Sequence, residues 1–386
     1  MNEWKTVRLG DYITEYSVKN KSNEDIPVYS VTNTQGFCTE YFSKDVSSKD
    51  KSNYKIVPRG CFAYNPSRIN VGSVDWQRYE DRVIVSPLYN VFKVSPELEN
   101  QYLYYFLKSD IGHTLITSKA EGSVRDNLKI TMLAEFSIPL PPLETQKLIA
   151  AQLDKCTALI AKHKQMLEKY DTLIKSRFIE MFGDNPIENG KWKVETLGSH
   201  LITIDNGKSF VCSDSMRKGE YPAILKLSAV TYGEYNQNEN KALLDEDMFL
   251  KKVEVKQGDL LFTRKNTPEL VGMAAYVFET ERNLMMPDLI FRLNVKDDLN
   301  KIYLWKLINH PVFRERIQNL ANGSAKSMSN ISKERLQALK IPVPPLSLQN
   351  NFATFVQQID KSKFAVQKSL EKAETLYKSL MQRYFA

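Results

Sequence analysis

Two segments of the chain carry apolar residues at alternating steps of four and three positions. Neither Pro nor Gly occurs in residues 146–182, where Lys, Leu, Glu, Gln and Ala dominate. The apolar positions there are Ile149, Leu153, Cys156, Ile160, Leu167, Tyr170, Ile174 and Met181, with His163 and Arg177 as the polar interruptions. The second series runs Phe352, Val356, Ile359, Val366, Leu370, Ala373, Tyr377, Leu380 and Tyr384, interrupted by Lys363. This spacing predicts two long helices, each with a heptad seam typical of a coiled coil.

A helix of this length extends roughly 55 Å, at about 1.5 Å per residue. Because one chain carries two such seams, the two helices can bury each other and hold the parts that precede them at a fixed separation. The alternative is that each helix packs on the part of the chain that precedes it.

The regions before the two helices show a different pattern. Short β-rich runs such as residues 26–31 and 288–293 alternate with turn-forming clusters, and each region ends in a helical stretch, at residues 100–109 and 301–309. We expect both regions to be α+β modules.

The whole chain is an internal repeat. IPLPPLETQ at 138–146 recurs as IPVPPLSLQ at 341–349, 203 positions later, and the register then holds without a gap to the end of each copy. Upstream, Trp4-Lys5 matches Trp192-Lys193 at an offset of 188, and Tyr102-Leu103 matches Tyr303-Leu304 at an offset of 201. The second copy has therefore gained residues, most simply in loops. The predicted parts are a module at 1–145, a helix at 146–183, a second module at 184–348 and a second helix at 349–386.

Composition narrows the class of protein. With 42% apolar and 26% charged residues, the chain has the balance of a folded protein. No apolar stretch is long enough to span a bilayer, the first residues lack a signal-peptide core, and the four cysteines show no disulfide or metal spacing. We therefore expect a cytoplasmic protein without membrane association. The formal net charge of +7 suits a polyanionic partner.

A module, a Pro-Pro-Leu lead-in with a nearby Gln, a long helix, and then all of these again: this layout resembles the specificity subunits of Type I restriction-modification systems. The resemblance covers essentially the whole chain, and the two Pro-Pro-Leu segments are its most specific part. The second segment has Ser347 where an acidic residue such as Glu144 is commoner.

The resemblance implies two α+β target recognition domains joined by two long antiparallel helices that form a coiled coil. Each domain would read one half of a bipartite site in double-stranded DNA, and the helices would set the length of the unread spacer. They would also dock two methyltransferase subunits, and the assembly would recruit the restriction (motor-nuclease) subunits.

Two regions at corresponding places in the repeat offer side chains that can contact bases and phosphates. Both should lie in loops, and the alternative is that these are ordinary solvated loops. The first region follows an apolar run in each module, so it should lie at a strand end; its candidates are Tyr64, Asn65 and Arg68, matched by Thr263, Arg264 and Lys265. The second has Gly-Ser followed by a basic residue, a plausible phosphate cradle; its candidates are Ser123 and Arg125, matched by Ser324 and Lys326.

A catalytic role is not indicated. Asn65-Pro66-Ser67-Arg68 lacks the second proline and the aromatic ring of an adenine methyltransferase loop, and neither a glycine-rich cofactor loop nor a phosphate-binding loop occurs. The four histidines have no metal-ligand spacing. We expect a non-catalytic subunit without cofactor or metal. Two alternatives stay open: a coiled-coil adaptor that does not bind DNA, and a nuclease or methyltransferase with unfamiliar motifs.

Overall fold

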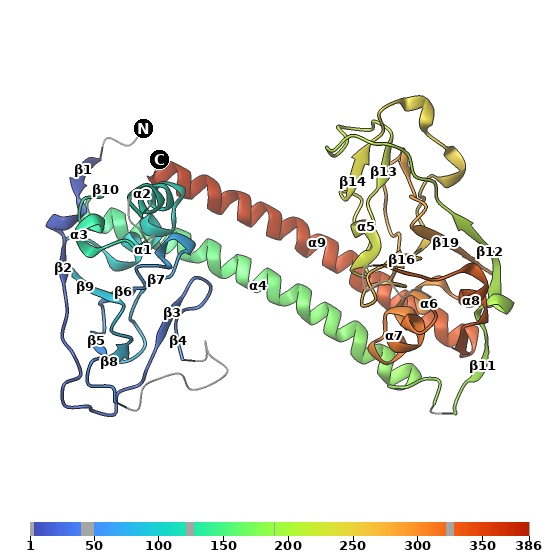
Figure 1. Ribbon diagram of the computed structural model, residues 1–386, viewed down its shortest axis with the longest axis horizontal. Coiled ribbons are helices and arrows are strands. Elements are labelled where there is room, and N and C mark those ends of the chain that lie inside the picture. Colours follow the sequence, from blue (N-terminus) through green and yellow to red (C-terminus); the bar gives the residue numbers. More distant parts are fainter. Residues whose placement is uncertain (1–3, 40–49, 121–126, 189, 322–327, 386) are drawn as a thin grey trace. The chain divides into compact units, whose positions relative to one another are not determined.

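A computed structural model describes residues 4–39, 50–120, 127–188, 190–321 and 328–385. The chain forms two compact units, which we call unit 1 (residues 1–166 and 366–386) and unit 2 (residues 167–365). Each unit therefore contains one module, one end of the first long helix and one end of the second (Figure 1).

Unit 1 is built on a four-stranded antiparallel sheet in the order β2-β9-β6-β7. Three two-stranded pairs accompany it, β1·β10, β3·β4 and β5·β8. Its strands are β1 Lys5–Arg8, β2 Ile13–Glu15, β3 Ser30–Thr32, β4 Gly36–Cys38, β5 Lys55–Pro58, β6 Phe62–Tyr64, β7 Val74–Trp76, β8 Arg82–Val85, β9 Asn90–Val94 and β10 Ser137–Leu140. Its own helices are α1 Asn100–Lys108, α2 Asp110–Ala120 and α3 Ile130–Leu133, with 3₁₀ turns at Leu9–Asp11 and Ile69–Val71.

Unit 2 repeats this plan. Its main sheet has the order β12-β19-β15-β17, and β11 pairs with β21 as β1 pairs with β10. The strands are β11 Lys193–Thr196, β12 Leu201–Asn206, β13 Ala223–Leu225, β14 Asn240–Ala242, β15 Leu260–Thr263, β16 Lys265–Asn266, β17 Ala274–Tyr276, β18 Leu284–Met285, β19 Ile290–Val295, β20 Ser329–Asn330 and β21 Lys340–Val343. The helices are α5 Ser228–Thr231, α6 Lys301–Asn309, α7 Pro311–Gln318 and α8 Lys333–Ala338, with 3₁₀ turns at Leu197–His200, Glu246–Met248 and Lys251–Val253. The predicted α+β modules and their repeat are confirmed.

The main sheet of each unit is covered on both faces. In unit 1, Phe62 and Phe92 stack at 5.0 Å and pack with α1 on one face, while Ala63 and Val91 pack with β5 and β8 on the other. Unit 2 has the same two layers of buried apolar residues. Successive strand residues point to opposite faces, so both sides of these strands are apolar.

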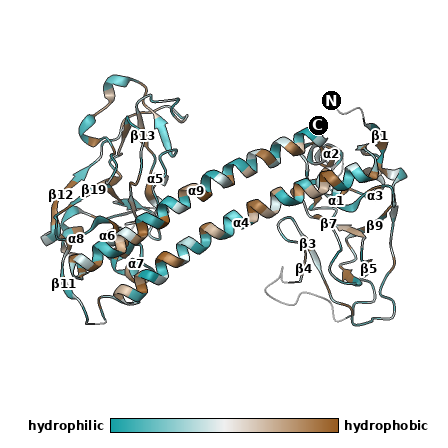
Figure 2. Ribbon diagram, turned by 180° about the vertical axis from the view of Figure 1, so that it is seen from behind, coloured by the Kyte–Doolittle hydropathy of each residue, from teal (hydrophilic) through white to brown (hydrophobic). Residues whose placement is uncertain are grey.

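The two long helices are α4 Leu143–Phe182 and α9 Leu346–Phe385, each of 40 residues. Apolar and polar residues alternate along both (Figure 2). Both begin three residues before the predicted starts, directly after the second proline. The reason is that proline fits the start of a helix, and its carbonyl still accepts: Pro142 O receives the N–H groups of Thr145 and Gln146 at 2.8 and 3.0 Å.

The helices run antiparallel. In unit 1, Gln152 of α4 accepts from Tyr384 of α9 at 2.5 Å, and Lys164 of α4 pairs with Glu374 of α9 at 3.1 Å. Residue numbers therefore increase along α4 in the direction in which they decrease along α9. In unit 2, Asp171 pairs with Lys363 at 2.8 Å in the same sense. The antiparallel coiled coil that the resemblance implies is confirmed.

The last turns of each long helix complete the core of the unit in which they end. Phe178 and Phe182 of α4 pack against Tyr303 of unit 2, and Phe385 of α9 packs against Tyr102 of unit 1, with ring centroids 5.2 Å apart. The alternative, in which each helix packs only on the module that precedes it, is therefore wrong for these ends.

A buried glutamine fixes the start of each long helix to its module. Gln146 is fully buried; its Oε1 accepts the N–H of Glu99 at 2.8 Å, and its Nε2 donates to the carbonyls of Glu97 and Pro141 at 3.0 and 2.9 Å. Gln349 of unit 2 accepts from the N–H of Asn300 and donates to Pro344 O in the same way. This is the physical role of the glutamine that follows each Pro-Pro-Leu.

Replacing Gln146 with Leu is expected to destabilise unit 1 by about 2–4 kcal/mol, because it removes the partner of the buried Pro141 carbonyl and of the part-buried Glu99 N–H and Glu97 carbonyl. The decrease in the urea midpoint of unfolding measures this. The matched control is Gln165→Leu at an exposed position of the same helix, where a change within about 0.5 kcal/mol is expected. Equal midpoints for the two variants would contradict this role of Gln146.

Candidate nucleic-acid interface

The first candidate loop of unit 1 directly follows β6, as the sequence predicts. Asn65 Oδ1 accepts from the N–H and the hydroxyl of Ser67 at 3.1 and 2.9 Å, and Asn65 O accepts from Arg68 N at 3.0 Å. The turn closes at Gly72, which has a φ of +89° that favours glycine. Ser67 and Arg68 are exposed and Asn65 is half-buried, so this loop presents an amide, a hydroxyl and a guanidinium.

Tyr64 faces the interior. Its side chain is fully buried, its hydroxyl donates to Leu128 O at 3.1 Å, and it accepts from Asn90 Nδ2 at 2.9 Å. Burial raises the pKa of the Tyr64 phenol well above its usual value. Tyr64 therefore supports the loop from inside in this structure, and its contact with DNA stays a prediction.

The corresponding loop of unit 2 follows β15. Thr263 is fully buried, and its Oγ1 accepts from Met273 N at 2.9 Å. Arg264 and Lys265 are half-buried. The Arg264 guanidinium lies over the Phe291 ring at 5.0 Å and donates to Asn330 Oδ1 through Nε and Nη2 at 3.4 and 3.3 Å. As with Tyr64, the contact of Thr263 with DNA stays a prediction, and it would need the side chain to leave the interior.

The structure brings the flanks of the two candidate regions together in each unit. In unit 1, Leu128 N donates to Pro66 O at 3.1 Å; in unit 2, Ile331 N donates to Arg264 O at 2.9 Å, and β16 pairs with β20. Leu128 and Ile331 lie 203 positions apart, so the contact is itself repeated. The remaining candidates, Ser123, Arg125, Ser324 and Lys326, lie outside the described residues.

Sequence reasoning missed two polar side chains of this site in unit 2. Asn330 holds the Arg264 guanidinium, and Lys333 lies over the same Phe291 ring at 5.8 Å. Their position directly after the second candidate region was the available signal. They extend the basic and amide-bearing surface around Arg264 and Lys265.

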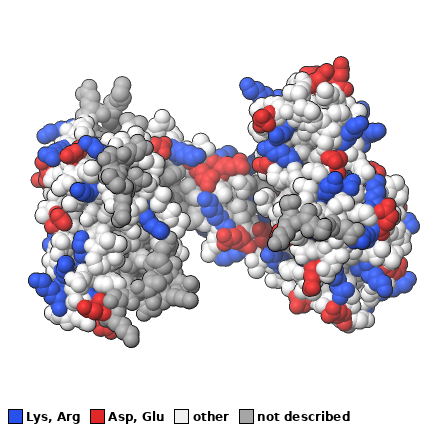
Figure 3. Space-filling model, in the orientation of Figure 1, with Lys and Arg blue, Asp and Glu red and all other residues white. Residues whose placement is uncertain are grey.

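Charge does not distinguish one surface on the face drawn in Figure 3. Lys and Arg side chains are interspersed with Asp and Glu in both units. The net charge of +7 therefore locates no interface on this face, and the candidate contacts rest on their repeated position.

The sequence matches a known protein family in a way that agrees with this architecture. The model of the Type I restriction modification DNA specificity domain matches residues 1–169 and 189–374, which is once per module and helix. The chain belongs to this family.

Relatives of known name agree with the family. The chain is 25% identical over 302 residues to the Type I restriction enzyme EcoKI specificity subunit of Escherichia coli K12, covering 74% of this chain and 64% of that protein, which is less than two thirds of its length. It is 23% identical over 403 residues to the MjaVIII specificity subunit of Methanocaldococcus jannaschii, covering 98% and 91%. The crystal structure of the Type I S subunit from M. genitalium has the same fold, with a TM-score of 0.62, 13% identity and coverage of 100% and 97%.

Among the residues that the structure describes, no group of three His, Cys, Asp or Glu side chains is placed to hold a metal ion. Within the same residues, no helix combines the length and apolarity needed to cross a membrane.

Proposed function

We propose that this chain is the sequence-reading subunit of a Type I restriction-modification system, with one half of a split DNA site read by each unit. The observation that carries the proposal is the repeat of a polar, basic loop at the same strand end of both units. Side chains of Asn, Arg and Lys supply the directional donors that base edges and phosphates require. Because the loops differ in sequence, the two half-sites differ as well.

In this proposal Asn65 and Arg68 contact DNA in unit 1, and Arg264 and Lys265 contact it in unit 2. Ser123 and Arg125, with Ser324 and Lys326, bind phosphates beside them. A reader with two linked modules gains effective concentration when both halves bind, provided that the connection matches the span between the half-sites. In this proposal the two long helices provide that connection.

The partners follow from the family. We propose that the chain itself is non-catalytic, acts in the cytoplasm, docks two methyltransferase subunits and takes part in an assembly with the restriction subunits. The relatives' names give them this role of specificity subunit, and catalysis would then reside in the partners.

A methylome tests this function. The chain is co-expressed with its methyltransferase subunit in a host that lacks adenine methylation, and modified adenines are mapped by single-molecule sequencing. We expect one split motif that disappears when the chain is omitted. Identical methylation with and without the chain would refute the proposal, and a complex that forms without any methylation would favour the adaptor.

A further inference from the structure

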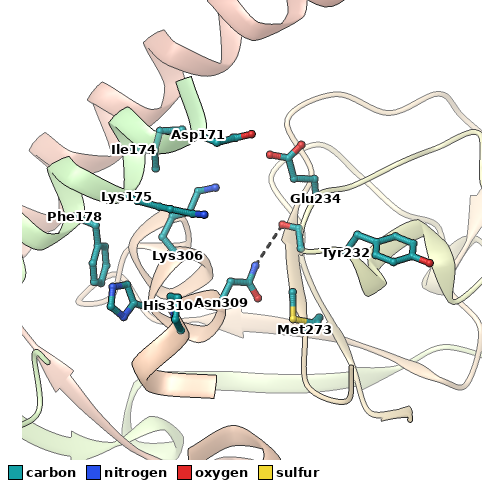
Figure 4. Close-up of a pocket in the computed structure, with 12 residues that line it drawn as sticks. Asp171, Ile174, Lys175, Phe178, Tyr232, Glu234, Met273, Lys306, Asn309 and His310 are labelled. Carbon is teal, nitrogen blue, oxygen red and sulfur yellow. Dashed lines mark hydrogen bonds between the residues drawn. The ribbon is translucent and has the colours of Figure 1, made fainter. Parts of the chain in front are cut away.

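Unit 2 contains a pocket of about 310 Å³ that the DNA-reading proposal does not use (Figure 4). Its walls come from the end of α4, the end of α6, the start of α7, residues 232–234 and Met273. Ile174, Phe178 and Met273 contribute apolar surface to the lining, with Phe178 and Met273 on opposite sides of the pocket (Figure 4). A volume of this size accommodates a small organic molecule.

Two ammonium groups line this pocket, that of the exposed Lys175 and that of Lys306. Among the described residues, no carboxylate lies within ion-pair distance of Lys175 or Lys306, and neither Nζ makes a hydrogen bond. Lys306 is largely buried, with its Nζ 3.5 Å from the centroid of the Trp305 ring. His310, which also lines the pocket, has a buried Nδ1 without a hydrogen-bond partner in the described part of the chain.

The acidic residues of the wall are already paired. Lys363 of α9 lies between them, with its Nζ 2.8 Å from Asp171 Oδ1 and 2.6 Å from Glu234 Oε1. Lys363 takes up the direct ion pairs of Asp171 and Glu234, so these two carboxylates, like Asp360 of α9, act on Lys306 only at longer range.

The repeat supplies an internal comparison. Lys306 occupies the place of Tyr105 in unit 1, at the offset of 201 that relates the two Tyr-Leu pairs, and the Tyr105 hydroxyl donates to Asp154 Oδ1 at 2.6 Å. The place of Asp154 is taken in unit 2 by Gln357, at the offset of 203. Where unit 1 has a hydrogen bond between a tyrosine hydroxyl and a carboxylate, unit 2 therefore has a lysine ammonium and a neutral glutamine.

Such an ammonium is costly to bury. Burial lowers the pKa of Lys306 to about 8, so it stays mostly charged at neutral pH. A buried charge without a direct ion pair destabilises a fold by its desolvation, and an anion that enters the pocket offsets that cost.

We propose that this pocket binds a small organic anion, with its phosphate or carboxylate head on Lys306 and Lys175 and its apolar part against Phe178 and Met273. This site is independent of the proposed DNA-reading function, because it uses none of the candidate DNA contacts.

Isothermal titration of the full chain tests the site with four probes: phenyl phosphate, benzoate, the neutral benzyl alcohol and an acidic peptide. We expect saturable binding of one anion per chain, and the tighter of the two anions identifies the head group. Lys306→Met should weaken that binding at least ~10-fold, the effect of losing one charge-assisted contact. The matched control is Lys378→Met, since Lys378 is the counterpart of Lys175 in unit 1, and it should bind the anion unchanged.

Folding of the variant is checked by its thermal midpoint, and Lys306→Tyr, which restores the residue type of unit 1, serves as a second variant. Both should fold and both should lose affinity. The proposal is overturned by equal affinity for benzyl alcohol, by unchanged affinity in both Lys306 variants, or by the absence of binding of either anion. It is also overturned if an acidic peptide binds at Lys306 more tightly than both small anions, because the site would then belong to a protein partner.

Discussion

Exchanging residues 192–340 for the corresponding module of another specificity subunit is expected to change one half of the methylated motif and to leave the other half intact. The effect should be complete: methylation at the original motif falls to background and a new split motif appears. The physical reason is that Arg264 and Lys265, with the loop around them, lie entirely within the exchanged segment, whereas Asn65 and Arg68 lie outside it. Mapping of modified adenines gives both halves in one measurement.

The exchange needs a donor that keeps the core of unit 2. Phe178 and Phe182 of α4 lie outside the exchanged segment but pack on Tyr303 inside it, with ring centroids 6.1 and 4.8 Å away. A donor with Tyr at that position preserves this contact. The control exchange replaces residues 192–340 with the same module from a relative that shares the motif, and the motif should stay the same. If the main exchange alters both halves at once, the division of reading between the units is wrong.

The arrangement of the chain could be predicted from the sequence because each of its signals is repeated. The Pro-Pro-Leu segments, the Tyr-Leu pairs and the heptad seams each occur twice at nearly constant offset, and a signal that recurs 203 positions later is unlike a chance match. The strand-end position of Asn65 and Arg264 followed from the same reasoning, since each comes directly after an apolar run and does follow β6 or β15.

Whether an individual side chain faces the core or the solvent was harder to predict from the sequence. Tyr64 was predicted at the DNA, but it lies two positions after Phe62 in the same strand, and residues two apart share a face of a sheet. Because Phe62 packs in the core, Tyr64 does so too. That alternation could have been applied to the sequence, and it also covers Thr263, which lies two positions after the buried Leu261. Only the hydrogen bond from Met273 N to Thr263 Oγ1 depends on a contact that the folded sheet defines.

At the C-terminal ends of α4 and α9, the buried residues differ from those that the heptad series predicts, for a similar reason. The heptad series predicts Arg177 and Met181 of α4, and Leu380 and Tyr384 of α9, at the inner face. The buried residues are instead one position later, at Phe178, Phe182, Met381 and Phe385. At these ends the helix packs against a module as well as against the other helix, so its buried face is rotated by about one residue, or ~100°. A periodicity read along one helix cannot include a surface that comes from elsewhere in the chain.

Replacing Phe385 with Ala is expected to destabilise unit 1 by about 3–5 kcal/mol, although Phe385 lies 245 residues after the last strand of that unit, which ends at Leu140. Its ring is 4% exposed and lies 5.2 Å from Tyr102 and 6.0 Å from Phe106. The substitution leaves a cavity between the sheet-covering helix α1 and α9. Hydrogen exchange followed by mass spectrometry locates the effect: the amides of β6 and β9 should exchange faster.

The repeat supplies the reciprocal variant. Phe182→Ala removes the corresponding ring, which lies 4.8 Å from Tyr303 and 5.4 Å from Phe352, and should accelerate exchange in β15 and β19 of unit 2 instead. Leu376→Ala, at a position of α9 that is 52% exposed, controls for general effects on the helix and should change stability by less than about 0.5 kcal/mol. If Phe385→Ala accelerated exchange in unit 2 and spared unit 1, then the end of α9 would not complete the core of unit 1. The two modules would then be stable without the helix that each receives from the other half of the repeat.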